Sequence, residues 1–435
     1  MSLIAIAGCG SPMASSGSGP SPQNFPFPAA NTLQFVHEFG TNNYEGDTIT
    51  GLVTDPDGDI LVAGYTAGNL PGYSVPDGVL KGALYAMDPS GNQLWAKELA
   101  QGSEAAFNGV AATPAGIFVL GDTRGAFAGA SNPNGIDETF VAKYDTSGNQ
   151  LWVKQYASLQ DTLPETICAD GNGNLIFAGE VDDSSGGQDM FVEEVDASGN
   201  ELWEKTYGTD AVDSLSSVTV DASGDIYAVG ATSGTFPGSH TSTLAQPFVL
   251  KLDGGTGATV WLQNFDGSTT PPIFYPSAIQ AVPGGKLDIV GESVAQITNN
   301  FPTDIQMEVM QMDAETDSAL WNIQFGAGNW NIPGQNLAVD TNGDIYVGGT
   351  TTGPVAPNVT ADIFLAKISS SGSGIWAQRI GTGMDGPTIA TSVSTPVYVS
   401  LANQSVFLGG MTAGQFQGFS NPNHDMELFL AKFGQ

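Results

Sequence analysis

The chain of 435 residues carries 45 Asp and Glu against 11 Lys and Arg, a formal net charge of −34 at pH 7. Nucleic-acid binding depends on clustered Lys and Arg, and an anionic membrane surface repels such a chain, so neither is expected as a partner of the folded body. Cations, basic proteins and neutral sugars remain as ligand classes. A hydrophobic content of 41%, with 57 Gly and 25 Pro among short apolar runs, favours a large β-rich core with many tight turns.

The N-terminal residues have the pattern of a processed leader. Residues 1–9 end in LIAIAGC, which resembles the bacterial lipobox, in which a signal peptide is cut before a Cys that is then acylated. We expect a truncated signal peptide with lipid attachment at Cys9, although no Lys or Arg precedes the apolar run. Residues 10–32, rich in Gly, Ser and Pro, predict a flexible tether. The folded body is then expected in the bacterial cell envelope, lipid-anchored to the outer membrane or cell surface, or otherwise secreted.

The remainder of the chain, residues 33–435, is built of repeats. Each unit is predicted to contain four short strands. Residues 51–55 and 60–64 are examples of the first and second strands, and residues 139–145 and 150–157, in the next repeat, are examples of the third and fourth. Four antiparallel strands repeated every 50 to 60 residues are typical of β-propeller blades. Trp marks the fourth strand at positions 95, 152, 203, 261, 321 and 376, and Gly closes the second strand at positions 64, 121, 179, 230, 291, 349 and 410.

The counts of these markers differ, and the difference predicts how the ring closes. There are seven Gly positions but six Trp positions, and the sequence ends just after the third strand of the seventh repeat. The segment 33–39 has Phe35 in the place of Trp, 60 residues before Trp95. We therefore predict an all-β, seven-bladed β-propeller with four antiparallel strands per blade, in which the N-terminal strand completes the last blade. Closure of this kind removes open sheet edges.

The repeats resemble a known family. FVAKYDTSGNQLWVKQYA (140–157) and LAVDTNGDIYVGGTTTG (337–353) look like the bacterial SBBP-type propeller repeat. KLDGGTGATVW (251–261) is also similar to the outer-strand docking motif of quinoprotein-type propellers. The resemblance implies a propeller fold and an extracytoplasmic setting, but no single chemistry, because propellers host many functions.

Two recurring motifs imitate functional sites. The pentad Asp-x-x-Gly-Asn/Asp resembles a calcium loop, but an EF-hand loop has Gly at position 6 and Glu at position 12. We interpret the pentad as a hairpin turn, and expect at most weak calcium binding at Asp55, Asp57 and Asp59; no other cofactor is predicted. The motif G-x-T-x-G resembles a nucleophile elbow, yet its five copies after second strands indicate a scaffold turn.

Candidate functional residues lie where the repeat is broken. Blades 3 and 5 replace the G-x-T-x-G turn and place Glu180 and Glu292 directly after the Gly. The ends of second strands share a face with the connections between blades, where we expect ligands to bind. Trp330, the Trp outside the repeat, can stack on a sugar or a cation there. The ligand-face candidates are Tyr44, Glu45, Asp47, Asp182, Trp330 and Asp385.

These features favour a monomeric, non-catalytic binding module for a protein or polysaccharide ligand. The first alternative is a carbohydrate-active hydrolase or lyase using Glu180 and Glu292, which requires carboxylates about 5–10 Å apart with different pKa values. The second is a quinoprotein-like oxidoreductase, which is disfavoured because neither an adjacent cysteine pair nor a cofactor constellation is found. Cys168 lies in an apolar strand and is expected to be a buried free thiol.

Overall fold

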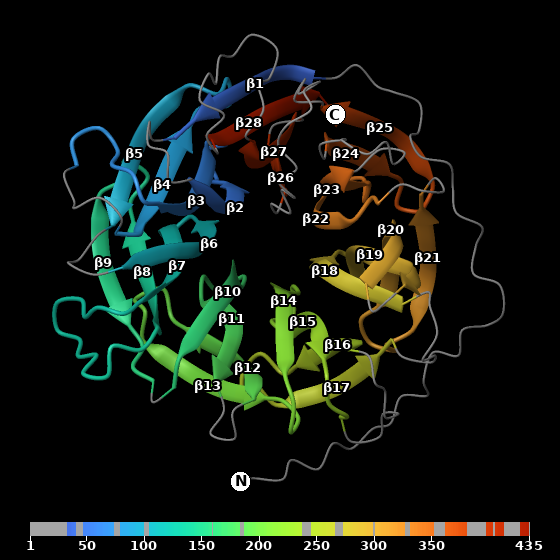
Figure 1. Ribbon diagram of the computed structural model, residues 1–435, viewed down its shortest axis with the longest axis horizontal. Helices are drawn as coiled ribbons and strands as arrows, with labels where there is room; N and C mark the ends of the chain where they lie inside the picture. Colours follow the sequence, from blue (N-terminus) through green and yellow to red (C-terminus); the bar gives the residue numbers. More distant parts are fainter. Residues whose placement is uncertain are drawn as a thin grey trace.

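The computed structural model describes residues 33–40, 47–73, 79–99, 104–158, 160–182, 187–236, 245–265, 273–298, 301–326, 331–351, 362–380, 397–402, 405–412 and 427–434. In these residues the regular elements are β-strands, arranged as seven four-stranded antiparallel sheets around a central axis (Figure 1). The predicted seven-bladed propeller is confirmed. No helix in the described part of the chain has the length and apolar character needed to cross a membrane.

Blades 1 to 4 follow one another along the chain, and each starts with its innermost strand. Blade 1 contains β2 (Thr48–Thr54), β3 (Ile60–Thr66), β4 (Lys81–Met87) and β5 (Gln93–Leu99). Blade 2 contains β6 (Ala105–Thr113), β7 (Gly116–Thr123), β8 (Glu138–Tyr144) and β9 (Gln150–Gln155). Blade 3 contains β10 (Thr162–Ala169), β11 (Leu175–Asp182), β12 (Gln188–Val195) and β13 (Glu201–Tyr207). Blade 4 contains β14 (Asp213–Val220), β15 (Ile226–Thr232), β16 (Gln246–Leu252) and β17 (Thr259–Asn264).

Blades 5 to 7 complete the ring. Blade 5 contains β18 (Ile273–Val282), β19 (Lys286–Thr298), β20 (Phe301–Asp313) and β21 (Ala319–Phe325). Blade 6 contains β22 (Gly334–Val339), β23 (Ile345–Thr351), β24 (Asp362–Ile368) and β25 (Gly374–Ile380). Blade 7 contains β26 (Tyr398–Ala402), β27 (Ser405–Thr412) and β28 (Glu427–Gly434), and its outer strand is β1 (Leu33–Phe39).

The ring is closed by the first strand of the chain, as the missing seventh Trp predicts. β1 pairs antiparallel with β28, with Val36 opposite Ala431 and Phe39 opposite Leu428 (Figure 1). Blade 7 thus joins the N-terminal and C-terminal ends of the described chain, and its outer strand leaves no unpaired edge on β28.

The Asp-x-x-Gly pentads form hairpin turns. In the turn that joins β2 to β3, Asp55 Oδ1 accepts the N–H groups of Asp57 and Asp59, both at 2.9 Å. Gly58 has φ +91°, a left-handed conformation that favours glycine. The same two bonds recur between β4 and β5, where Asp88 Oδ1 accepts from the second and fourth residues after it. One side chain therefore satisfies two backbone donors in each turn.

The outer-strand aromatics connect each blade to the next. Trp95 of blade 1 lies against Gly148, in the last turn of blade 2, and a methyl group added to that glycine would be 2.8 Å from the indole ring. The Trp95 Nε1–H also donates to the carbonyl of Thr146 at 3.0 Å. Phe35 of the closing strand meets Gly91 of blade 1 in the same way. The corresponding pairs are Trp152 with Gly199, Trp203 with Gly257 and Trp321 with Gly372.

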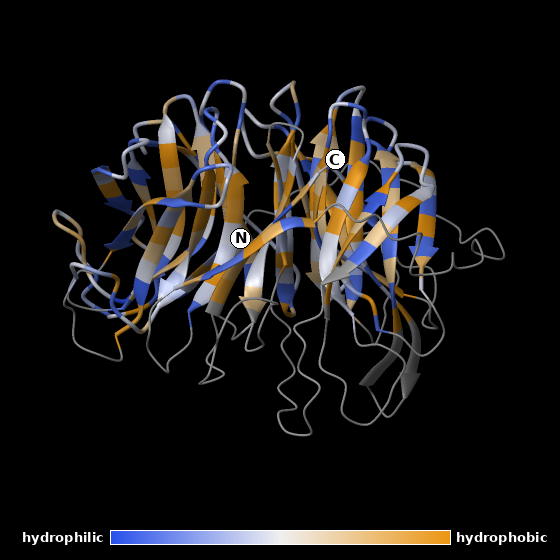
Figure 2. Cartoon of the chain, turned by 90° about the horizontal axis from the view of Figure 1, so that it is seen from above, coloured by the Kyte–Doolittle hydropathy of each residue, from blue (hydrophilic) through white to orange (hydrophobic). Residues whose placement is uncertain are grey.

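The hydrophobic core lies between blades. The buried side chains of the described residues form seven clusters, one at each junction of two adjacent blades. Figure 2 shows the apolar strands standing side by side through the thickness of the ring, with polar turns at their ends. A rigid ring of this kind fixes the positions of the side chains that reach its axis and its loop-bearing face.

Candidate functional site: an acidic face and an axial cavity

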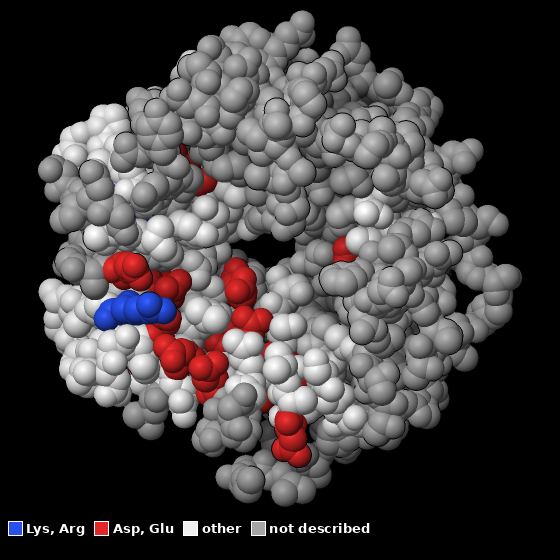
Figure 3. Space-filling model, in the orientation of Figure 1, with Lys and Arg blue, Asp and Glu red and all other residues white. Residues whose placement is uncertain are grey.

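The inter-blade connections and the ends of the second strands share one face of the ring, here called the loop face. Acidic side chains gather on this face over blades 2 and 3, beside the central opening, around a single basic residue (Figure 3). We call this group the acidic patch. Its members are Glu104, Asp122, Arg124, Asp137, Asp161, Glu180 and Asp182.

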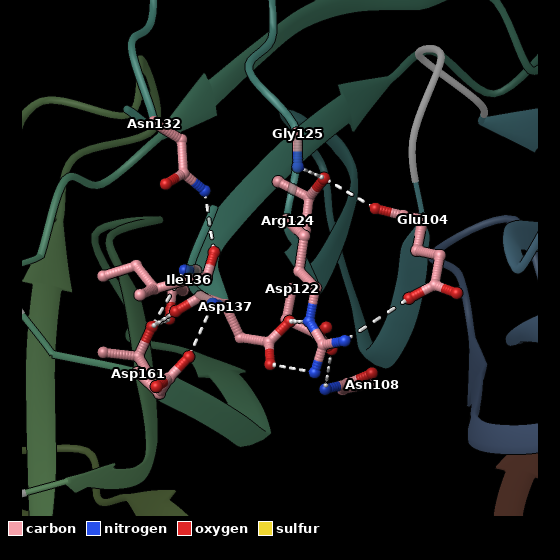
Figure 4. A network of polar contacts seen from close by, with 12 residues as sticks. Glu104, Asn108, Asp122, Arg124, Gly125, Asn132, Ile136, Asp137 and Asp161 are labelled. Atoms are coloured by element: carbon pink, nitrogen blue, oxygen red, sulfur yellow. Dashed lines mark hydrogen bonds and ion pairs between the residues drawn. The ribbon is translucent and has the colours of Figure 1, made fainter. Parts of the chain in front are cut away.

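Arg124 is the centre of the acidic patch (Figure 4). Its Nε and Nη2 atoms donate to the two carboxylate oxygens of Asp137 at 2.9 and 3.0 Å, a bidentate pair. Its Nη1 atom lies 3.9 Å from Glu104 Oε2. Asp161 completes the group, because its Oδ1 accepts the backbone N–H of Asp137 at 2.8 Å. Two carboxylates thus pair with one guanidinium and the charge of a third, Asp161, acts on it, so the group keeps a net negative charge.

Asp122 lies deeper, between Arg124 and the axis. Its Oδ1 accepts a hydrogen bond from Asn108 Nδ2 at 2.9 Å (Figure 4). The same amide donates to the carbonyl of Pro164 in blade 3 at 2.8 Å. Burial raises the pKa of Asp122 to about 6; the charge of Asp137 adds to this rise, while Asn108 and Arg124 oppose it. The Asn108 amide thus ties the acidic patch to the inner strands of two blades.

A ring of β-bulges surrounds the axis. In six blades the pairing between the inner strand and its neighbour shifts by one residue near the start of the inner strand. A bulge leaves one residue unpaired and redirects its side chain. The unpaired residues are Thr50, Asn108, Glu165, Ser216, Ser277 and Gln335.

An axial cavity of about 350 Å³ lies among these bulges and is lined by the inner strands of all seven blades. Most of its polar lining is neutral, from hydroxyl and amide side chains such as Ser216, Ser277 and Gln335. Glu165 is the one acidic or basic side chain among the described residues that line it. Tyr398 lines it from blade 7.

The Glu165 side chain is solvent-exposed and lines the cavity. Desolvation by the surrounding protein raises its pKa to about 7, and the charges of Glu180 and Asp122 contribute to the rise. The pKa of Tyr398 is raised by burial and then by the charge of Glu165, so the two side chains interact across the cavity. Within the described residues, no hydrogen bond reaches the Glu165 carboxylate.

The two catalytic candidates from the sequence lie at equivalent positions in different environments. Glu180, at the end of β11, accepts the backbone N–H of Leu215 in blade 4 at 3.2 Å. Glu292, in β19, raises the pKa of Tyr275, which pairs with it across the sheet. Burial raises the pKa of both carboxyl groups. In the described structure, no hydrogen bond or charge interaction joins Glu180 to Glu292; Glu180 acts on Glu165 instead.

The other candidates are distributed unevenly. Asp182 is exposed at the end of β11, on the loop face, and its backbone N–H donates to the carbonyl of Asp161. Asp47 is only 3% exposed, because it packs against Gly40 where the chain passes from β1 to β2. The remaining ligand-face candidates lie outside the described residues, as does the lipid-attachment site Cys9. These outside candidates are Tyr44, Glu45, Trp330 and Asp385.

The recurring motifs have structural explanations. Asp55, Asp57 and Asp59 are arranged by the hairpin turn, and the described part of the chain holds no group of three or more His, Cys, Asp or Glu side chains placed to bind a metal ion. The threonine of G-x-T-x-G makes a local turn, as in Thr66, whose Oγ1 accepts the N–H of Gly68 at 2.8 Å. Cys168 is a free thiol, and burial raises its pKa to about 12.

Known proteins share the repeat. The family model described as SBBP, beta-propeller repeat, matches residues 34–71 and 320–354. These two stretches of the chain therefore match the SBBP β-propeller repeat. Each matched stretch begins in the outer strand of one blade and ends after the second strand of the following blade. The sequence repeat therefore starts one strand earlier than the structural blade, and for this reason the first strand of the chain, β1, belongs to the last blade. No curated protein sequence matches the chain.

Solved structures that match the chain have low sequence identity to it. YCF48 bound to D1 peptide is 14% identical, with a TM-score of 0.48, and the match covers 94% of this chain and 98% of that one. The β-propeller domain of the Trilobed protease from Pyrococcus furiosus is 9% identical, with a TM-score of 0.48 and coverages of 90% and 96%. Quinohemoprotein alcohol dehydrogenase from Comamonas testosteroni is 11% identical, with a TM-score of 0.42 and coverages of 91% and 76%.

Sequence reasoning missed the residues that converge on the axis. Glu165 occupies a position where the other blades have Thr, Asn, Ser or Gln, so it breaks the repeat as clearly as Glu180 does. That signal is readable in the sequence once the bulge position is known. Arg124 gave a weaker signal, because it occupies a variable position inside the G-x-T-x-G turn.

Proposed function

We propose that this propeller is a non-catalytic binding module that takes a basic segment of a partner protein on the acidic patch. The observation that supports this best is the convergence of Glu104, Asp137 and Asp161 on one arginine. Exposed ion pairs of this type contribute little to stability, about 0–1 kcal/mol each. Their excess charge, placed on rigid elements beside the cavity, instead favours the approach of a cationic surface.

The test is the binding of a lysine-rich peptide, measured by calorimetry, against a peptide in which glutamine replaces lysine. We expect the lysine peptide alone to bind, with affinity falling as salt rises from about 50 to about 300 mM, because salt screens exposed charges. The double variant Glu104→Gln, Asp182→Asn should weaken binding about three- to tenfold, since it removes two exposed charges of the patch.

Glu201→Gln is the matched control, because it removes an exposed carboxylate from the outer strand β13, away from the patch. Equal weakening by the control and the double variant would show that only the net charge of the protein matters and would refute the proposal. Release of reducing sugar from a polysaccharide by the wild-type protein, lost in Glu180→Gln, would support the hydrolase alternative instead.

The proposal also includes attachment to the cell envelope through a lipid at Cys9, on the strength of the LIAIAGC motif. Metabolic labelling of the full chain with a radioactive fatty acid tests this. Labelling should be lost in Cys9→Ala and kept in Cys168→Ala, the matched cysteine control. Size-exclusion chromatography of the unanchored body tests the expectation of a monomer.

A further inference from the structure

We propose that the axial cavity binds one alkylammonium group, the chemistry of a lysine side chain, with its nitrogen at the Glu165 carboxylate. This inference rests on the proposed function in one respect: the basic segment that lies on the acidic patch would supply the group. It adds a second, separate site, because the cavity is lined by inner strands whereas the patch is carried by loops and strand ends.

The charge of the cavity favours a cation. Glu165 is the one carboxylic acid of its described lining, and no Lys, Arg or His is found in that lining. Two further carboxylates, Glu180 and Asp122, lie close enough to raise the pKa of Glu165. The neighbouring guanidinium of Arg124 is already paired with Asp137. A positive ligand group would therefore relieve repulsion that the described protein does not neutralise.

The hydrogen bonds of the bulge ring show why Glu165 is available. Three other bulge residues, Thr50, Asn108 and Gln335, form hydrogen bonds with the next blade. Thr50 Oγ1, for example, donates to the carbonyl of Phe107 at 2.7 Å, and Gln335 Oε1 accepts the N–H of Val397 at 3.0 Å. In blade 3 this connection is made by Glu180, which accepts the N–H of Leu215 in blade 4. Glu165 lines the cavity, and no hydrogen bond among the described residues occupies its carboxylate.

The size and composition of the lining select the kind of cation. About 350 Å³ is at the lower end of ligand-pocket volumes, which suits a side chain and excludes a large cofactor. An ammonium group has three donors, and Glu165 can accept one while hydroxyl oxygens such as that of Ser216 accept others. Val110 and Ile167 supply apolar surface for a methylene stem.

The experiment measures binding of 1,5-diaminopentane to the full chain by calorimetry or NMR titration, at a pH near 8. We expect saturable one-to-one binding, and at least a tenfold loss of affinity in Glu165→Gln. The matched control is Glu201→Gln, which removes an exposed carboxylate from the outer strand β13, away from both the patch and the cavity, and should change diamine affinity by less than twofold. Retention of diamine binding by Glu165→Gln, or absence of saturation in the wild-type protein, would overturn the inference.

Lowering the pH gives an independent readout. Glu165 faces Glu180, Asp122 and Tyr398, and its pKa of about 7 means that it gains a proton between pH 8 and pH 6. Diamine affinity should fall over this range in the wild-type protein and stay flat in Glu165→Gln. Both variants are expected to melt at or above the wild-type temperature, so a loss of binding is not a loss of folding.

A lysine-containing peptide and its Nε-acetylated form identify the source of the ammonium group. Tighter binding of the unmodified peptide than of the diamine, with the difference lost in Glu165→Gln, supports a side chain of a partner protein. If the peptide binds but is insensitive to Glu165→Gln, the cavity inference fails while the proposed function stands. If the diamine binds and the peptide does not, the proposed function fails and the cavity takes a free amine.

Discussion

Glu193 is a buried carboxyl group at a position where other blades have apolar residues. It is 4% exposed and lies directly opposite Glu204 on the neighbouring strand, whereas the equivalent cross-strand pair in blade 4 is Leu250 and Leu262. Burial raises the pKa of Glu193 to about 9, and the charges of Glu204 and Glu201 add to the rise. Glu193 is therefore neutral in the folded protein at pH 7.

Replacing this residue should stabilise the protein in a pH-dependent way. The pKa is raised in the folded state, so the favourable contribution of the neutral form is complete below about 4.5 and is lost as the pH rises towards 9. Glutamine is neutral in both the folded and the unfolded state, so Glu193→Gln takes up no proton on folding. We expect the free energy of unfolding of this variant to exceed that of the wild type by about 1–3 kcal/mol at neutral pH. Urea unfolding between pH 5 and 9 measures the difference, which should grow with pH and level off above about 9.

Asp182→Asn is the control for this series, because its carboxylate is exposed and its removal should produce no comparable trend. A difference between Glu193→Gln and the wild type that is constant from pH 5 to 9 would contradict the assignment of Glu193 as neutral.

At the scale of the element, the hairpin turn has two roles. Each pentad turn closes its own blade, and the glycine of the turn between the third and fourth strands also receives the aromatic residue of the preceding blade. The turn between the first and second strands has the same backbone conformation without that contact, as at Gly224, where φ is +91° and nothing lies within 4 Å of an added methyl group.

This difference makes a controlled experiment. Gly148→Ala should cost about 2–4 kcal/mol, because it combines a left-handed conformation with overlap against the Trp95 ring. Gly224→Ala should cost only about 1–2 kcal/mol, since alanine there adopts the left-handed conformation but overlaps with no neighbouring atom. Thermal and urea unfolding of both variants compare the costs. Equal destabilisation would mean that contact between the aromatic ring and the next blade contributes nothing.

The strands and turns were largely predictable from the sequence. Hydrophobic alternation and the Asp-x-x-Gly signal are local properties of the chain, so the predicted strand 139–145 corresponds to β8, Glu138–Tyr144. The bulges of the inner strands were not predicted. A bulge depends on how the inner strand packs around the axis with six others, and no spacing in the sequence marks it.

At the scale of the whole molecule, closure of the ring depends on β1. Deleting residues 1–39 should expose β28 as an unpaired edge and remove the Phe35 contact with Gly91. We expect an aggregating or poorly folded protein by size-exclusion chromatography and light scattering. Deletion of residues 1–32 is the control and should leave melting unchanged, because the contacts of β1 begin at Leu33. A monomeric deletion of residues 1–39 that melts like the wild type would refute the closure.

The repeat in the sequence was sufficient to predict seven blades, the order of their strands and the strand that closes the ring, because these follow from a pattern renewed about every 50 to 60 residues. The repeat was not sufficient to predict that Glu165 lies near Tyr398, or that no hydrogen bond among the described residues reaches the Glu165 carboxylate. Those features arise only when inner strands from opposite sides of a closed ring meet at the axis and Glu180 takes over the contact with the next blade. Local patterning specifies elements, whereas a site at the centre of a ring is a property of all seven blades together.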